Sequence, residues 1–124
     1  MDRTLDLRPK SGYYLARMPF EIILAPEAVS DPRRLSARDR GKVRDAMVTH
    51  LRHEPTKVSR SRIKRLRGLS RPQYRLRVDE LRVFYDVMGS EVQLLAIVAK
   101  SDADAWLAEK GRYDEESSSL GSEG

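Results

Sequence analysis

Several features that would point to familiar protein classes are missing from this chain of 124 residues. It contains no cysteine, which excludes disulfide bonds, thiolate catalysis and cysteine-based metal sites. No apolar run approaches the roughly 18 residues that a membrane-spanning helix needs. The longest apolar stretch, VQLLAIVA at 92–99, has the length of a strand. The N-terminus lacks the apolar core and small-residue cleavage site of a secretory signal. We therefore expect a cytoplasmic protein without a membrane partner.

The common enzyme motifs are also absent. There is no glycine-rich loop of the kind that holds phosphates, no Gly-x-Ser-x-Gly elbow, and no marked Ser/His/Asp triad. Histidine occurs only as His50 and His53, with Glu54 adjacent. Two histidines near the end of a predicted helix are too few ligands for a metal site. We predict no metal site and no cofactor.

What the chain does have is a concentrated block of positive charge. The net charge is +5, and the segment 56–82 contains only two acidic residues, Asp79 and Glu80. Its basic residues are Lys57, Arg60, Arg62, Lys64, Arg65, Arg67, Arg71, Arg75, Arg77 and Arg82. Such a block indicates a polyanionic partner, either nucleic acid or an acidic protein segment. The alternative is a solvated cationic surface without a specific partner.

The length predicts one domain. Residues 1–17 show no sustained periodicity, so we expect a loose N-terminal extension, with Met18 as an alternative translational start. We place the domain at 18–111. Residues 112–124 are rich in Asp, Glu, Ser and Gly, and we expect an acidic, disordered tail.

The first half of the domain predicts one strand and two helices. The β-prone run 20–24 (FEIIL) stops at Pro26, which can open a helix that Pro32 makes short or kinked. Ser36 and Asp39 have capping-box spacing for a second helix, which Pro55 ends. Its apolar residues recur at helical spacing, at Val43, Met47 and Leu51.

The second half predicts a sheet and a last helix. A strand fragment or ordered loop is expected at 63–66, then strands at 74–78, 81–88 and 92–98 that form an antiparallel meander. Ser101 and Asp104 repeat the capping spacing before a short helix that ends at Gly111. The predicted order is β-α-α-β-β-β-α. This is an α+β fold, a small antiparallel sheet with a helical hairpin packed on one face and a short C-terminal helix.

The segment YRLRVDELRVFYDV (74–87) presents three arginines on two adjacent strands. Strand alternation places Arg75 and Arg77 on one face, and the cross-strand register decides whether Arg82 joins them. Guanidinium groups held so near to one another repel unless an anion bridges them. Their placement therefore favours the binding of phosphate or carboxylate. The alternative is that they lie over an apolar sheet and pair with neighbouring acids, at Asp79, Glu80 or Asp86.

The span 18–111 resembles the RelE/ParE superfamily of toxins from type II toxin–antitoxin systems. The resemblance lies in the opening strand followed by PEAVSD, the helical segment that ends in HEPT, the basic element RIKRLRG, and YRLRVDELRVFYDV. The superfamily signature LxG…YRxRxxxxRVxY is matched here by Leu66, Gly68, Tyr74, Arg75, Arg77, Arg82, Val83 and Tyr85. The resemblance implies a RelE-like fold.

RelE-like toxins are metal-independent, ribosome-dependent mRNA endoribonucleases that inhibit translation, in which a ribose 2′-hydroxyl attacks the adjacent phosphate. The resemblance implies that Arg75, Arg77 and Arg82 form the cationic cluster, and Lys100 keeps a basic group near the end of the domain. Arginine stays protonated and is a poor base, so the remaining proton carriers are Glu80, Tyr85 or Lys100. We predict Arg75, Arg77, Arg82, Lys100 and Tyr85 as catalytic residues. Within the basic block, we predict nucleic-acid contacts from Arg62, Lys64, Arg65, Arg67 and Arg71. The chain departs from the family pattern at Ser101, where arginine is expected, and has Trp106 but no tyrosine near the end of the domain.

Two alternatives to the nuclease remain open. ParE-like members of the superfamily bind DNA gyrase and inhibit it without cleaving nucleic acid. An inactive member would act as a binding module only. The nuclease and both alternatives imply a cognate antitoxin, which we expect to be acidic and partly disordered and to cover the basic face or displace the last helix.

Overall fold

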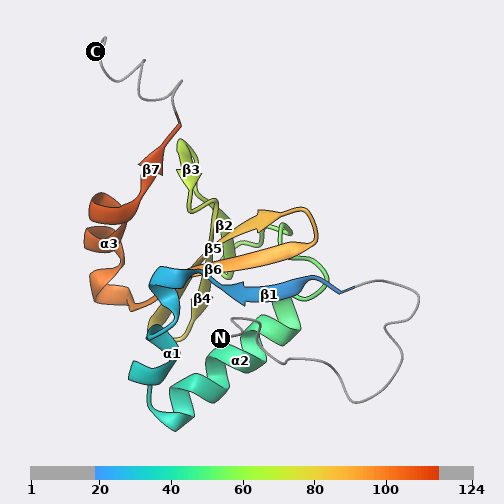
Figure 1. Cartoon of the computed structure of the whole chain (residues 1–124), viewed down its shortest axis with the longest axis vertical. Helices are drawn as coiled ribbons and strands as arrows, with labels where there is room; N and C mark the ends of the chain where they lie inside the picture. Colours follow the sequence, from blue (N-terminus) through green and yellow to red (C-terminus); the bar gives the residue numbers. More distant parts are fainter. Residues whose placement is uncertain (1–18, 115–124) are drawn as a thin grey trace.

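The structure, a computed structural model, describes residues 19–114 (Figure 1). The predicted extension at 1–17, and all of the predicted tail except 112–114, lie outside the described residues. The fold is α+β, as predicted, with a five-stranded sheet, a separate two-stranded sheet and three α-helices among these residues.

The five-stranded sheet has the order β1-β6-β5-β4-β2. Its strands are β1 (Glu21–Leu24), β2 (Ile63–Arg65), β4 (Tyr74–Val78), β5 (Leu81–Met88) and β6 (Glu91–Ala99). The predicted meander of β4, β5 and β6 is confirmed. The expectation of an entirely antiparallel sheet is wrong, because β1 pairs in parallel with β6. The helical segment after β1 carries the chain to the far edge at β2, and the meander then fills the sheet back towards β1.

The first helix is short, as predicted from Pro32, and it is divided in two. A 3-10 turn, η2 (Pro26–Ala28), is followed by a single-turn helix, α1 (Asp31–Arg34), and then by the long α2 (Ala37–His50). Pro32 lacks the N–H that would continue the turn begun at Pro26, so the segment before α2 forms two short pieces. The start of α2 is as predicted, since the Ser36 side chain accepts a hydrogen bond from the Asp39 N–H at 3.0 Å.

The last helix, α3 (Ala103–Lys110), begins differently from the prediction. A 3-10 turn, η3 (Lys100–Asp102), leads into it, and no side chain caps its first turn, so the capping role predicted for Ser101 is wrong. After Gly111, the short strand β7 (Arg112–Tyr113) pairs with β3 (Leu69–Arg71), and Figure 1 shows the two side by side beyond α3. This small sheet was not predicted, and β7 lies past the predicted domain end.

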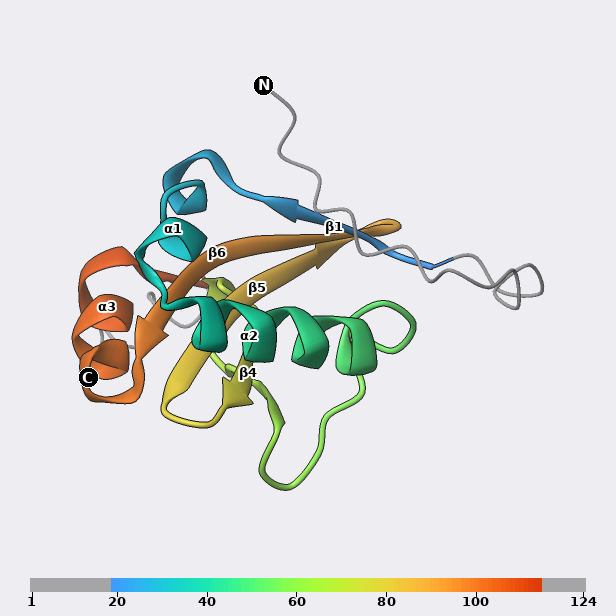
Figure 2. The same ribbon diagram turned by 90° about the horizontal axis from the view of Figure 1, so that it is seen from below.

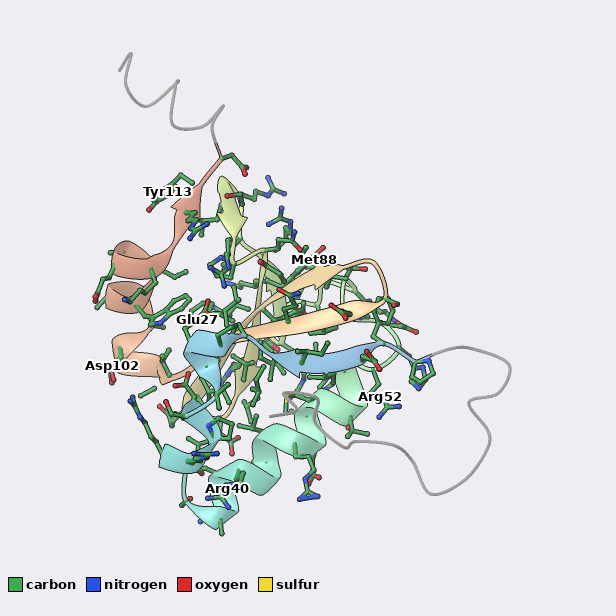
Figure 3. All side chains as sticks on the ribbon, in the orientation of Figure 1. Glu27, Arg40, Arg52, Met88, Asp102 and Tyr113 are labelled. Carbon is green, nitrogen blue, oxygen red and sulfur yellow. The ribbon has the colours of Figure 1, made fainter. Side chains whose placement is uncertain are left out.

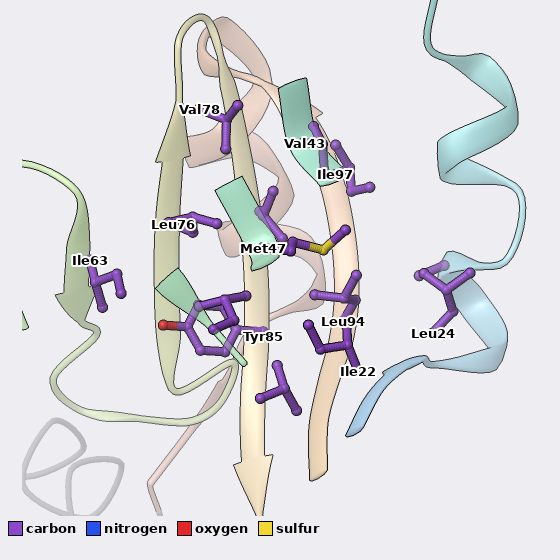
Figure 4. Packing of buried hydrophobic residues seen from close by; sticks show 14 residues of the cluster. Ile22, Leu24, Val43, Met47, Ile63, Leu76, Val78, Tyr85, Leu94 and Ile97 are labelled. Carbon is purple, nitrogen blue, oxygen red and sulfur yellow. The ribbon is translucent and has the colours of Figure 1, made fainter. Parts of the chain in front are cut away.

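Apolar side chains pack on both faces of the large sheet. On one face, Val43 and Met47 of α2 join Leu76, Tyr85 and Leu94 in the main core (Figures 2 and 4). On the other face, α3 contributes to a smaller cluster around Phe84, Ala96 and Ala103. Because both faces are anchored in this way, β4 and β5 form a rigid platform.

Candidate nucleic-acid interface

Strand register brings four cations onto one face of the sheet. Arg77 is the direct cross-strand partner of Arg82, and Arg75 is the partner of Lys64 on the opposite neighbouring strand. Directly paired residues share a face, and so do residues two apart along one strand. Arg82 therefore joins Arg75 and Arg77, a point that the sequence had left open. We call Lys64, Arg75, Arg77 and Arg82 the arginine face.

The arginine face lies on the same side of the sheet as α3. Phe84 pairs with Arg75 across the ladder and stacks on Trp106 of α3, with ring centroids 4.8 Å apart and planes inclined by 6°. Val98, the partner of Arg82 on β6, packs against the same small cluster. The stacked pair of rings thus borders the cations with a rigid apolar wall.

Within the described part of the chain, two cations of this face make no direct ion pair, although Asp104 and Asp79 lie within electrostatic reach of Arg75 and Arg77. Among the described residues, Lys64 and Arg77 make no ion pair, and the buried Nε of Arg75 has no hydrogen-bond partner. Burial lowers the pKa of Arg75, and the charges of Arg82 and Arg77 lower it further, while Asp104 opposes them. A bound anion would relieve this repulsion.

Arg82 is held more tightly than its neighbours. It is only 7% exposed, and its Nη1 donates to the carbonyl oxygens of Asp79 at 2.9 Å and Leu81 at 2.8 Å. Asp79 in turn forms a 2.7 Å ion pair with Lys42 of α2. The guanidinium group is thereby fixed at the turn between β4 and β5, and part of its hydrogen-bonding capacity is used within the protein.

A hollow of about 390 Å³ opens near this turn. It is lined by Glu80, Ala99, Lys100, Ser101 and Asp104. The Lys100 N–H donates to the Glu80 carbonyl at 2.7 Å, which fixes η3 against the turn. Lys100, predicted as a catalytic residue, therefore lies at the end of the hairpin that carries Arg82. The sequence had not indicated that Asp104 would lie within electrostatic reach of Arg75.

Tyr85 lies on the opposite face of the sheet. Its side chain is fully buried in the main core, stacks on Tyr74 at 5.4 Å and donates to the Pro55 carbonyl at 2.7 Å. Burial raises the pKa of its hydroxyl. The prediction that Tyr85 belongs to one site with the arginines is therefore wrong. The sequence already indicated this separation, because residues three apart on one strand, such as Arg82 and Tyr85, point to opposite faces of the sheet.

The residues predicted to contact RNA are spread over the surface. Only Lys64 joins the arginine face. Arg65 lies over the Tyr74 ring at 5.3 Å and donates to the Leu66 and Gln73 carbonyls, which places it with the core side.

The remaining three lie elsewhere. Arg71 pairs with Glu27, which Figure 3 labels, and lies 3.9 Å from Asp86. Arg67 is exposed in the turn before β3, and Arg62 lines a different hollow at the end of α2.

Among the residues that the structure describes, no three His, Cys, Asp or Glu side chains lie close enough together to hold a metal ion. No helix in the same part of the chain is long and apolar enough to cross a membrane. Comparison with protein-family models gave no match, and comparison with curated proteins gave none either.

Proposed function

We propose that this chain is a RelE/ParE-type toxin with a RelE-like fold, and that its arginine face binds the sugar–phosphate backbone of RNA. The observation that supports this is the direct pairing of Arg77 with Arg82, with Arg75 and Lys64 on the same face. Four cations held on one face of a sheet fit a chain of phosphates. The alternative of arginines neutralised by neighbouring acids is less well supported, because Lys64 and Arg77 make no ion pair among the described residues.

The proposed RNA is mRNA on the ribosome, and the proposed site of action is the cytoplasm. In metal-independent cleavage a ribose 2′-hydroxyl loses its proton and attacks the adjacent phosphate, and the 5′-oxygen leaves with a proton. Arginines suit the stabilisation of the extra negative charge on the phosphorane. They stay protonated and are poor bases, so proton transfer falls to groups near the hollow, Glu80, Lys100 and Asp104.

The second candidate is a ParE-like toxin that inhibits DNA gyrase without nuclease activity, and the same observations leave room for an inactive binding module. The position of Tyr85 favours these alternatives more than the sequence did, because one member of the expected catalytic set is buried on the far face. Under each proposal the cognate antitoxin is acidic, and its carboxylates cover the arginine face.

The deciding experiment adds purified protein to translating ribosomes and maps mRNA ends, with a parallel assay of gyrase supercoiling. We expect cuts in phase with codons that Arg77→Gln reduces by on the order of 100-fold, since one lost charge contact to the transition state costs that much. Arg44→Gln, an exposed arginine of α2 on the other side of the sheet, is the control. Intact mRNA together with inhibited supercoiling would replace the nuclease by the ParE-like alternative.

A further inference from the structure

A second hollow, of about 540 Å³, lies where α2 ends and the chain approaches β2. His50, His53, Lys57, Ser59 and Arg62 are among the residues that line it. They come from the last turn of α2 and from the loop 51–62, so the chain brings them together independently of the arginine face.

The polar groups of this hollow are mostly donors. The Ser59 Oγ accepts the N–H groups of Arg62 and Ile63, each at 3.0 Å, so its own hydrogen remains to be donated. In the described part of the chain, the side chains of Arg62 and His53 form no hydrogen bond or ion pair with an acceptor. Lys57 pairs with Glu54 at 3.3 Å, the one acidic residue of the lining.

His50 adds a neutral donor to the same hollow. Burial lowers the pKa of His50, and the nearby charge of Arg62 lowers it further. The imidazole is therefore neutral at neutral pH and still carries one N–H. A cation, a neutral imidazole and a hydroxyl that line one space are suited to the oxygens of a phosphate group.

The hollow is connected to the arginine face through Arg62. The carbonyl oxygen of Arg62 accepts the Arg77 N–H at 2.8 Å, so the backbone of Arg62 lies beside β4 while its side chain reaches the hollow. β2, which follows Arg62, is an edge strand of the large sheet. A nucleic-acid strand that crossed this edge from the arginine face would pass the backbone of Arg62, whose side chain lines the hollow.

We propose that this hollow is a phosphate-binding site, and that it holds a second phosphate of the RNA strand whose neighbouring phosphates lie on the arginine face. The identity of the strand rests on the proposed function, whereas the recognition of phosphate does not. The occupant is thus a phosphodiester held by Arg62 and Ser59, with His50 and His53 at its sides.

The first test uses inorganic phosphate and is independent of RNA. The ring C–H signals of His50 and His53 are followed by NMR at fixed pH, with chloride at equal ionic strength as the reference. We expect both signals to shift with phosphate in the wild-type protein and in Arg60→Gln, and not in Arg62→Gln. Arg60 is an exposed arginine of the same loop that does not line the hollow, so it controls for the lost charge. Equal shifts in chloride and phosphate would overturn the site.

The second test identifies the source of the phosphate with single-stranded RNAs of about 4 and about 16 nucleotides, the range of a single-domain binding site. For the longer RNA, Arg62→Gln is expected to weaken binding on the order of tenfold and to lower the slope of log affinity against log salt by about 0.7. The shorter RNA should bind both proteins equally, because it fills only the arginine face.

The two proposals fail in distinguishable ways. A phosphate response without RNA binding by the wild-type chain overturns the proposed function and leaves a phosphate site. Conversely, Arg60→Gln and Arg62→Gln could weaken RNA binding to the same extent at both lengths. Arg62 would then contribute only its net charge, and this result overturns the second phosphate site.

Discussion

Arg77 and Arg82 face each other directly across the β4–β5 ladder, two like charges at paired positions. Such a pair destabilises a sheet, so Arg77→Gln should raise the free energy of unfolding while it weakens RNA binding. We expect a gain on the order of 0.5 kcal/mol at low salt, shrinking as salt screens the repulsion. Urea denaturation at two ionic strengths measures it.

Arg82→Gln is the matched comparison, since it removes a charge from the same pair. It should destabilise the protein, because the carbonyls of Asp79 and Leu81 lose their shared donor. If both substitutions destabilise equally and independently of salt, the repulsion between the paired arginines is negligible.

Tyr85→Phe should lower stability without affecting RNA binding. The substitution leaves the Pro55 carbonyl without the buried donor that it has at 2.7 Å, which costs about 1–2 kcal/mol. Tyr74→Phe is the control, because Tyr74 stacks on Tyr85 but its hydroxyl forms no hydrogen bond among the described residues. Urea denaturation gives the stabilities. Loss of RNA binding in Tyr85→Phe, with the fold intact, would return this residue to the site.

The contrast between Tyr85 and Arg82 shows what the sequence can and cannot predict here. Local patterns predicted β4, β5 and the Ser36 cap, because alternation, turn residues and capping act over a few positions. The same alternation already separated Arg82 from Tyr85. The family motif includes both residues, and for that reason they were predicted to belong to one site.

Long-range pairing was beyond such patterns. The parallel contact between β1 and β6 depends on where the chain goes after the helices, and β3 and β7 are too short for alternation to mark them. The pairing of Lys64 with Arg75 depends on the register of β2, and the stacking of Phe84 on Trp106 depends on how α3 docks. These contacts define much of the candidate site, which is why the fold was more predictable than the site.

The ion pair between Lys42 and Asp79 should make stability depend on pH. The hydrogen bond from Lys42 is the main cause that holds the pKa of Asp79 below its ordinary value of 3.8 in the folded protein. A lowered folded pKa contributes stability above the unfolded pKa, and that contribution is lost as pH falls through the folded value. Lys42→Met should therefore be less stable than the wild type at neutral pH and should converge with it in acid.

Asp79→Asn is the control for this pair. Asp79 has φ of 51°, a left-handed conformation that asparagine also tolerates, so the turn should persist while the charge is lost. Its pH profile should match that of Lys42→Met when both are followed by urea denaturation from neutral pH to about pH 2. A difference between Lys42→Met and wild type that stays constant over this range would mean that Lys42 acts through packing alone.

Gly41→Ala should stabilise the protein. Gly41 lies inside α2, and a Cβ built there meets no atom within 4 Å, so alanine removes the entropic cost of glycine without a clash. We expect a gain of about 0.5–1 kcal/mol in the free energy of unfolding. RNA binding should be unchanged, because α2 packs on the face opposite the arginines.

Gly111→Ala provides the opposite case at the end of α3. A Cβ there would lie 2.6 Å from the Leu107 carbonyl oxygen, a backbone atom that already accepts the Gly111 N–H. The turn from α3 into β7 would have to shift, so this substitution should lower the melting temperature while Gly41→Ala raises it. A rise in both would show that the α3–β7 junction adapts freely, and the Phe84–Trp106 wall beside the arginine face would then be less rigid than its packing indicates.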